Sequence, residues 1–126
     1  MEGLLSGLNS AQRKAAEHIK GPVMVIAGAG SGKTLVLTYR IAHLLATGTD
    51  AFQILALTFT NKAAREMKAR IAKVVSADEA KNVWMGTFHS IFARILRVEG
   101  SRLGFPSNFT IYDTEDAQKV VANVIK

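Results

Sequence analysis

The chain has 126 residues, of which 48% are hydrophobic, enough for one domain with a buried core. It has no cysteine, which excludes disulfides and thiolate metal sites, and no apolar run approaches the roughly 18 residues of a membrane span. The formal net charge of +6 suggests a polyanionic partner, although many basic domains only carry solvated lysines.

The first part of the chain predicts a helix, a strand and a second helix. Residues 8–20 form the first helix, with Asn9 or Ser10 as its cap, and "VMVIA" predicts a strand that runs into a glycine-rich turn. Residues 33–46 form the second helix, which Gly48 ends. Its wide apolar face comprises Leu35, Val36, Leu37, Ile41, Leu44 and Leu45.

The rest of the chain continues the alternation of strands and helices. "QILALTF" predicts a strand before a helix over 61–75, whose buried side carries Ala63, Met67, Ile71 and Val74. "NVWMGT" predicts a strand with Trp84 in the core, followed by a helix over 89–100 that buries Phe92, Ile95 and Leu96. "FTIYD" predicts a short fourth strand, and residues 114–126 a helix capped by Thr114 or Asp113.

This alternation predicts an α/β fold with a parallel sheet and right-handed crossovers. The strands are near-continuous apolar runs, typical of a sheet covered on both faces. Ligands of such sheets bind at the carboxyl ends of the strands, where "GAGSGKT", "TFTNK" and "GTFHS" all fall. The last helix reaches Lys126 without glycine, proline or a polar tail, so we expect a longer protein beyond it, whereas the N-terminus looks natural and lacks a secretory signal.

The segment "AGAGSGKT" fits the phosphate-loop pattern, with alanine in place of the first glycine. Its three glycines allow positive φ angles, so that successive N–H groups can face a phosphate beside the N-terminus of the following helix. Lys33 can reach the β- and γ-phosphates, and the Thr34 hydroxyl can bind Mg²⁺. The predicted nucleotide contacts are Ala27, Gly28, Ala29, Gly30, Ser31, Gly32, Lys33 and Thr34.

Hydrolysis of a nucleotide also needs carboxylates that hold the metal and position water. Only "FTIYDTED" offers a candidate, because Asp113 follows a short, half-polar strand. A helix cap is the favoured role for Asp113, with a metal-site acid as the alternative. We therefore expect the catalytic carboxylates to lie outside this chain.

Four segments resemble, in order and spacing, the N-terminal part of superfamily 1 DNA helicases of the UvrD/Rep/PcrA type. They are "LNSAQ", "VIAGAGSGKTLVLTYRIAHLL", "ILALTFTNKAAREMKARI" and "GTFHSIFARILR". The resemblance implies a truncated phosphate-loop, RecA-like motor domain over 1–112 and the start of an inserted helical subdomain over 113–126. It also implies ATP with Mg²⁺, 3′-to-5′ translocation on single-stranded DNA, duplex unwinding, and a cytoplasmic, bacterial-type protein associated with the nucleoid.

The resemblance also assigns roles to residues. Gln12 would read adenine through its amide, and Lys33 and Thr34 would be the catalytic phosphate and magnesium contacts. The DNA track would comprise Thr58, Phe59, Thr60, Asn61, Lys62, Gly86, Thr87, Phe88, His89 and Ser90. In many relatives an arginine that packs on the base follows the threonine of the loop, but this chain has Leu35 there. The family's Asp-Glu segment and second motor domain are also absent from this sequence.

Phe59 and Phe88 each end a predicted strand in a "TF" context, so they could stack on bases of a single strand. The alternative is that both pack in the core, which is usual for phenylalanine. With the resemblance, DNA contact is favoured for Phe59, while both roles stay open for Phe88.

Polar and charged neighbours supplement these aromatics. Lys62 falls in the first turn of its helix, where a cation opposes the dipole unless an anion such as a phosphate is near. Asn61 can cap this helix and offer its amide to DNA. His89 could contact DNA or make a hydrogen bond within the protein, and a metal-ligand role is disfavoured. The remaining cations of this helix, Arg65, Lys68, Arg70 and Lys73, are predicted to be a solvated face.

The leading hypothesis is therefore an ATP-dependent DNA helicase of which this chain is the N-terminal motor segment, inactive in turnover by itself. Its partners would be single-stranded DNA or a duplex junction and the remainder of the same protein, with no membrane. The alternatives are a module that binds nucleotide or DNA without turnover, and an unrelated phosphate-loop kinase or ATPase.

Overall fold

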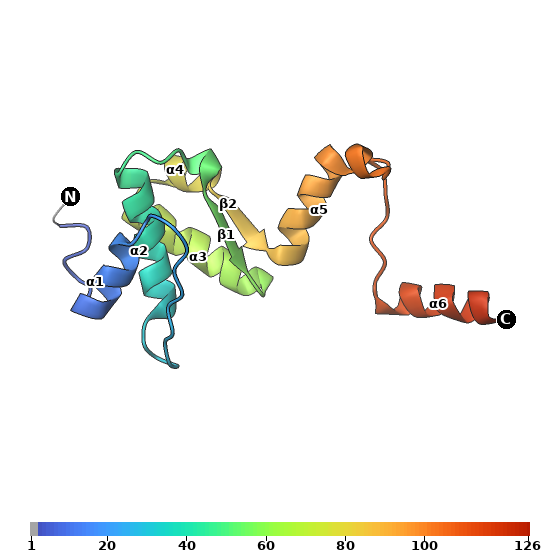
Figure 1. Ribbon diagram of the computed structural model, residues 1–126, viewed down its shortest axis with the longest axis horizontal. Helices are drawn as coiled ribbons and strands as arrows, with labels where there is room; N and C mark the ends of the chain where they lie inside the picture. Colours follow the sequence, from blue (N-terminus) through green and yellow to red (C-terminus); the bar gives the residue numbers. More distant parts are fainter. Residues whose placement is uncertain (1–2) are drawn as a thin grey trace. The chain divides into compact units, whose positions relative to one another are not determined.

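The computed structural model describes residues 3–126 as two compact units, one ending at Ile91 and one running from Phe92 to Lys126. The first unit contains the helices α1 (Ser10–Glu17), α2 (Lys33–Ala46), α3 (Asn61–Val74) and α4 (Ala77–Asn82) and the short 3-10 helix η1 (Ala51–Gln53). Its strands are β1 (Leu55–Thr58) and β2 (Trp84–Thr87). Figure 1 labels these elements.

Helix α5 (Phe88–Glu99) begins in the first unit and leads into the second. The second unit continues with the 3-10 helix η2 (Gly100–Leu103) and ends with α6 (Thr114–Ile125). Within residues 3–126, no helix is both long and apolar enough to cross a membrane.

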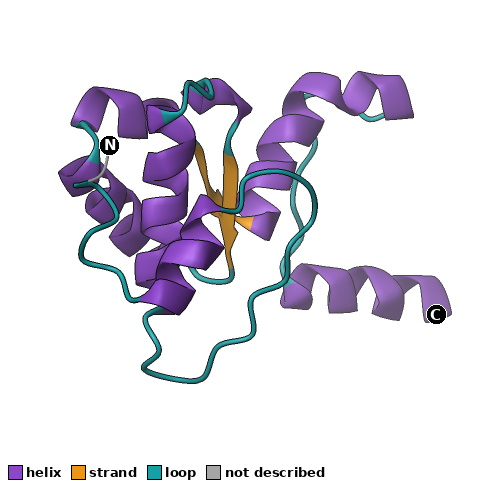
Figure 2. Cartoon of the chain, turned by 60° about the vertical axis from the view of Figure 1, so that its left-hand side comes forward, coloured by secondary structure: helices purple, strands orange, loops and turns teal. Residues whose placement is uncertain are grey.

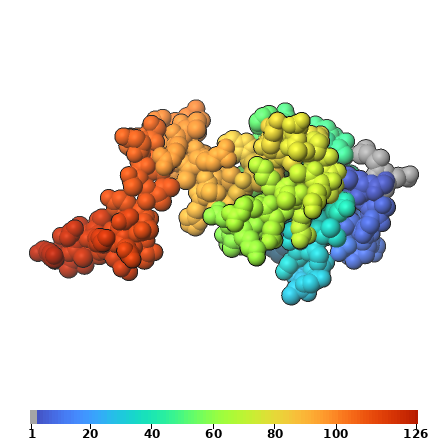
Figure 3. Space-filling view, turned by 180° about the vertical axis from the view of Figure 1, so that it is seen from behind, coloured from blue at the N-terminus to red at the C-terminus, as the bar shows by residue number. Residues whose placement is uncertain are grey.

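The two strands form a parallel pair, in register from Leu55 opposite Trp84 to Thr58 opposite Thr87. The connection between them contains α3, which contacts both strands and also packs against α2 and α4. Figure 2 shows the strands in orange among these helices, and Figure 3 shows α3, in lime green, on the rear face of the first unit. The predicted parallel pairing of these two strands is confirmed, with both elements shorter than expected.

The core of the first unit lies between this sheet, α2 and α3. Its buried residues are Ile41, Ile54, Ala56, Met67, Ile71, Ala80 and Val83. Met67 and Ile71 belong to the apolar side predicted for α3, and Ile41 belongs to the apolar face predicted for α2. A second, smaller cluster of Leu5, Leu8 and Ala16 packs α1 and the residues before it against α2.

Helix ends follow the predicted signals with one exception. Asn9 caps α1, and Gly48, with a φ of 94°, follows the end of α2. Asp113 caps α6, where its carboxylate accepts the N–H of Asp116 at 2.8 Å. The prediction that Asn61 caps α3 is wrong: the Thr60 hydroxyl accepts the N–H of Ala63 at 3.1 Å, and Asn61 is the first helical residue.

Two predicted strands, over the "VMVIA" and "FTIYD" segments, do not form. Residues 22–28 have no regular structure, and Met24 and Ile26 are 85% and 91% exposed. A strand needs a neighbour for its backbone groups, and β1 and β2 pair with each other. Residues 109–113 are likewise irregular, and Arg97 of α5 donates to the carbonyl of Phe109 at 3.4 Å.

Fewer apolar side chains are buried than the sequence pattern predicts. Leu55 of β1 is 49% exposed, so the described residues do not cover both faces of the sheet. Trp84 is half-buried at the start of β2 rather than in the core. On α5, Ile91 is buried, whereas Phe92 and Leu96 remain 48% and 36% exposed because their helical face has no covering element in the second unit.

Candidate functional site

The glycine-rich segment before α2 forms a tight loop. Gly30 and Gly32 have φ angles of 74° and 80°, a region that favours glycine, whereas Gly28 does not use this freedom. The Ser31 hydroxyl donates to the carbonyl of Gly28 at 2.6 Å, and the Ser31 N–H donates to the same oxygen at 3.3 Å. Together these bonds close the turn immediately before α2.

The start of α2 presents unpaired donors at this loop. The first backbone bond that α2 makes back to the loop is from the N–H of Val36 to the carbonyl of Gly32, at 3.0 Å. No acceptor among the described residues takes the N–H groups of Lys33, Thr34 and Leu35. Such open donors at the positive end of a helix dipole attract anions such as phosphate.

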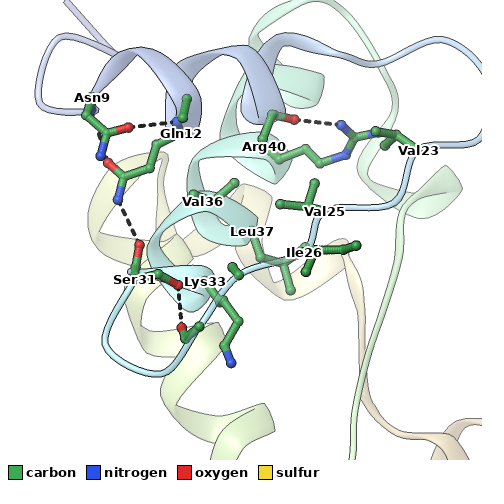
Figure 4. A pocket seen from close by; sticks show the side chains of 14 residues that line it. Asn9, Gln12, Val23, Val25, Ile26, Ser31, Lys33, Val36, Leu37 and Arg40 are labelled. Carbon is green, nitrogen blue, oxygen red and sulfur yellow. Dashed lines mark hydrogen bonds between the residues drawn. The ribbon is translucent and has the colours of Figure 1, made fainter.

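Lys33 and Thr34 begin α2 with exposed side chains. The Lys33 ammonium makes no ion pair with any residue from 3 to 126, and its side chain extends beside the loop in Figure 4. The Thr34 hydroxyl also has no partner in the described chain, whereas its carbonyl accepts the hydroxyl of Thr38 at 2.8 Å. Both functional groups are therefore available to a ligand at the loop.

Gln12, on α1, contacts this loop directly. Its amide nitrogen donates to the carbonyl of Ser31 at 3.1 Å, and its amide oxygen accepts the N–H of Asn9 at 3.1 Å. The structure thus brings Gln12 and the predicted phosphate loop together. Its adenine-reading role stays a prediction, because both ends of the amide have protein partners in this arrangement.

A cavity of about 630 Å³ lies between α1, α2 and residues 23–28 (Figure 4). Its volume is within the range of small-molecule sites. The apolar wall is formed by Val23, Val25, Ile26, Val36 and Leu37, and polar groups come from Asn9, Gln12, Ser31, Lys33 and Arg40. All lining residues fall between Asn9 and Arg40, so the strand-end segments do not contribute to this cavity.

Two lining positions differ from what the sequence suggests. Leu35, which stands where many relatives have arginine, packs against the cluster of Leu5, Leu8 and Ala16 and does not line the cavity. Arg40 lines the cavity instead, and its guanidinium donates to the carbonyls of Ala15, at 2.9 Å, and His18. The sequence gives no signal for Arg40, because its partners are distant in the chain.

The carboxyl ends of β1 and β2 form a second cluster of predicted residues, here called the strand-end edge (58–62 and 86–90). Thr58 lies opposite Thr87, and its hydroxyl donates to the carbonyls of Thr60, at 3.1 Å, and Gly86, at 3.4 Å. The Thr87 hydroxyl accepts the N–H of Ser90 at 3.2 Å. The prediction that three segments meet at the strand ends is confirmed for "TFTNK" and "GTFHS" and is wrong for "GAGSGKT", which no strand precedes within the described residues.

Phe59 and Phe88 meet at this edge. Their ring centroids are 5.7 Å apart with an interplanar angle of 38°, and the rings are tilted against each other. Phe59 is 93% exposed and Phe88 is 43% exposed. The alternative that both pack in the core is therefore wrong for this structure. An exposed phenyl ring supported by a second one is a stacking surface available to a planar ligand.

The other residues of the edge divide into exposed and buried groups. Thr60, Asn61, Lys62, His89 and Ser90 are exposed. Gly86 and Thr87 are buried, and a Cβ on Gly86 would lie 2.8 Å from the Ser90 hydroxyl. The burial of Gly86 and Thr87 favours a structural role for both residues. The sequence alone does not distinguish this role from contact with a ligand.

Lys62 has a partner within α3. Its ammonium lies 4.0 Å from a carboxylate oxygen of Glu66, one turn further along α3. Both side chains are mostly exposed, so this pair contributes little to stability. It does, however, supply an anion near the start of α3, which weakens the argument that Lys62 needs an external phosphate.

The remaining sequence candidates have exposed side chains. Arg65, Lys68, Arg70 and Lys73 are all exposed on α3, as predicted for a solvated face. The His89 side chain makes no hydrogen bond within the described chain, so the internal alternative for it is not realised. Over residues 3–126, no three His, Cys, Asp or Glu side chains gather in a group that could hold a metal ion.

The matching family model is that of the UvrD/REP helicase N-terminal domain, over residues 8–126, and the chain belongs to this family. It is 50% identical over 127 residues to the ATP-dependent DNA helicase PcrA of Staphylococcus aureus, and 48% identical over 126 residues to that of Leuconostoc citreum. These alignments cover 100% and 99% of the chain, but the chain spans only 17% of the length of either relative. By name, both relatives are ATP-dependent enzymes that act on DNA.

Proposed function

We propose that this chain is the N-terminal, ATP-binding segment of a DNA helicase motor with a phosphate-loop, RecA-like fold. The observation that carries the proposal is the loop before α2, where open N–H groups and the exposed side chains of Lys33 and Thr34 lie together at a helix N-terminus. Membership of the UvrD/REP family and the PcrA relatives support the same function. Residues 1–112 would belong to the motor domain and residues 113–126 to the start of an inserted helical subdomain.

At the loop, backbone donors hold the polyphosphate and the Lys33 ammonium balances its β and γ charges. The exposed Thr34 hydroxyl fits a hard cation, and Mg²⁺ bound there would neutralise the charge that develops on the phosphates. Gln12 lies at the cavity wall, where its amide can read the adenine after exchanging a protein partner. The apolar wall of Val25 and Ile26 lies along the same cavity.

At the strand-end edge, single-stranded DNA would lie across exposed groups of β1, α3 and α5. Phe59 offers a ring to a base, while Asn61, Lys62, His89 and Ser90 offer polar contacts to phosphates and sugars. ATP-driven movement along this strand, in the 3′-to-5′ direction, would unwind duplex ahead of it. DNA as the substrate implies a cytoplasmic protein at the nucleoid, with the remainder of the motor as its partner.

Binding without turnover is the second candidate for the chain itself. It is favoured because Asp113, the strand-end acid that the sequence offered, is engaged as the cap of α6. Hydrolysis would then require carboxylates from the rest of the protein. An unrelated phosphate-loop kinase is disfavoured by the family match, which extends through both strand-end segments.

The test is ATP binding and hydrolysis by the purified chain and its Lys33→Ala variant. Loss of a charge-assisted contact predicts about 10- to 150-fold weaker binding of a fluorescent ATP analogue. Lys73→Ala makes the same charge change on exposed α3 and is expected to bind as the parent chain does. Equal affinity of the Lys33 variant and the parent would contradict the site, and steady hydrolysis that depends on Lys33 would contradict binding without turnover.

A further inference from the structure

The Gln12 side chain connects α1 with the glycine-rich loop, although Gln12 and Ser31 are 19 positions apart in the sequence. Its amide oxygen accepts the N–H of Asn9 and so completes the capping box of α1. Its amide nitrogen donates to the carbonyl of Ser31, inside the glycine-rich loop. Figure 4 shows the chain of hydrogen bonds from Asn9 through Gln12 to Ser31 and onward within the loop.

The Ser31 carbonyl lies just before the N-cap of α2, which is Gly32. The first backbone bond of this helix is from the N–H of Val36 to the carbonyl of Gly32, so the N–H groups of Lys33, Thr34 and Leu35 are open, as at any helix N-terminus. The Ser31 carbonyl accepts no backbone N–H from the described residues, and Gln12 is its donor. The bond therefore ties the loop to α1 at the residue that precedes these open donors.

Gly32 shows independently that the amide approaches the loop closely. A Cβ at this position would lie 2.9 Å from the Gln12 amide nitrogen, closer than such atoms can approach. Glycine at 32 thus permits both the φ of 80° and the contact with Gln12. The capping box fixes one end of the Gln12 amide, so the orientation of its nitrogen toward the loop is set by α1.

We propose that Gln12 is a positioning residue for the phosphate loop, in addition to any contact that it makes with a base. By holding the Ser31 carbonyl, it presets the loop for polyphosphate and lowers the ordering cost of binding. This inference rests on the proposed nucleotide site. It differs from base reading in one respect: the effect of Gln12 extends to a ligand that has no base.

The experiment compares binding of Mg²⁺ with inorganic triphosphate and of Mg²⁺ with ATP, by calorimetry on the purified chain. Gln12→Met removes the donor and the acceptor without a charge change. Gln12→Glu keeps an acceptor for Asn9, replaces the donor to Ser31 by a second carboxylate oxygen, and lowers the net charge by one. Arg13→Gln is the control, because it also lowers the net charge by one and removes a different α1 contact, the 3.2 Å bond from Arg13 to the carbonyl of Leu5.

Loss of one amide–carbonyl bond predicts about 2- to 10-fold weaker triphosphate binding in both Gln12 variants, relative to Arg13→Gln. Without ligand, hydrogen exchange of residues 28–34 should be faster in both variants than in the control. If both variants bind ATP more weakly but bind triphosphate as the control does, Gln12 acts only by contacting the base, and the inference is overturned. If the parent chain binds neither ligand, the proposed nucleotide site itself is wrong.

Discussion

Phe59 offers the sharpest test of the strand-end edge. Its ring is 93% exposed, so Phe59→Ala should cost the fold little, and its ring–ring contact with Phe88 is largely a surface contact. Since Phe88 lies against Phe59, at 5.7 Å between centroids, we expect one base to stack on Phe59. Alanine substitution of such a ring costs about 1–3 kcal/mol per stacked base, or about 5- to 150-fold in affinity.

The assay is fluorescence anisotropy with a labelled oligothymidylate at low salt, with thermal unfolding measured in parallel. Phe52→Ala is the matched control: Phe52 is 65% exposed in η1, which precedes the amino end of β1, so the same phenyl is removed from the opposite end of the strand. Phe59→Trp should retain binding. Equal affinities for Phe59→Ala and Phe52→Ala would refute the stacking argument.

Two further substitutions test the charges and the loop. Lys62→Ala should weaken oligonucleotide binding and reduce the slope of log affinity against log salt by about 0.7. Lys73→Ala, at the far end of α3, should change neither quantity, and equal slopes for the two variants would show that Lys62 does not contact DNA. Gly32→Ala should lower the free energy of unfolding by about 1–2 kcal/mol or more, because Gly32 has a positive φ and lies close to the Gln12 amide. Gly28 has open space around it, so Gly28→Ala should have a smaller effect, as measured by thermal unfolding.

The sequence predicted well those elements whose partners lie within the chain. β1 and β2 pair with each other, and α3 between them buries Met67 and Ile71 as its periodicity indicated. The segments "VMVIA" and "FTIYD" also contain residues that favour strands, but they have no neighbouring strand and form no ladder. Propensity describes a residue's fit to a sheet and does not supply the sheet.

The features of the candidate site likewise include some that the local sequence predicts and some that depend on packing between distant residues. The loop, Lys33 and Thr34 follow from local spacing, whereas an exposed role for Phe59 is favoured over core packing only by the family resemblance. The bond from Gln12 to Ser31 and the Arg40 contacts with the end of α1 depend on how helices pack, which no local pattern encodes. The cap of α3 was misplaced by one residue, because Thr60 and Asn61 are both good caps.

The parallel direction of β1 and β2 determines how this edge would bear a mechanical load. Both carboxyl ends point the same way, so a pull on DNA held there would draw the two strands in one direction and would not slide one past the other. The tension would pass along the strands to Ile54 and Val83, the residues immediately before them, which are only 7% and 4% exposed in the core. The N–H of Trp84, the residue after Val83, donates to the carbonyl of Ile54 at 3.0 Å, so the two strands are also joined to each other at this end.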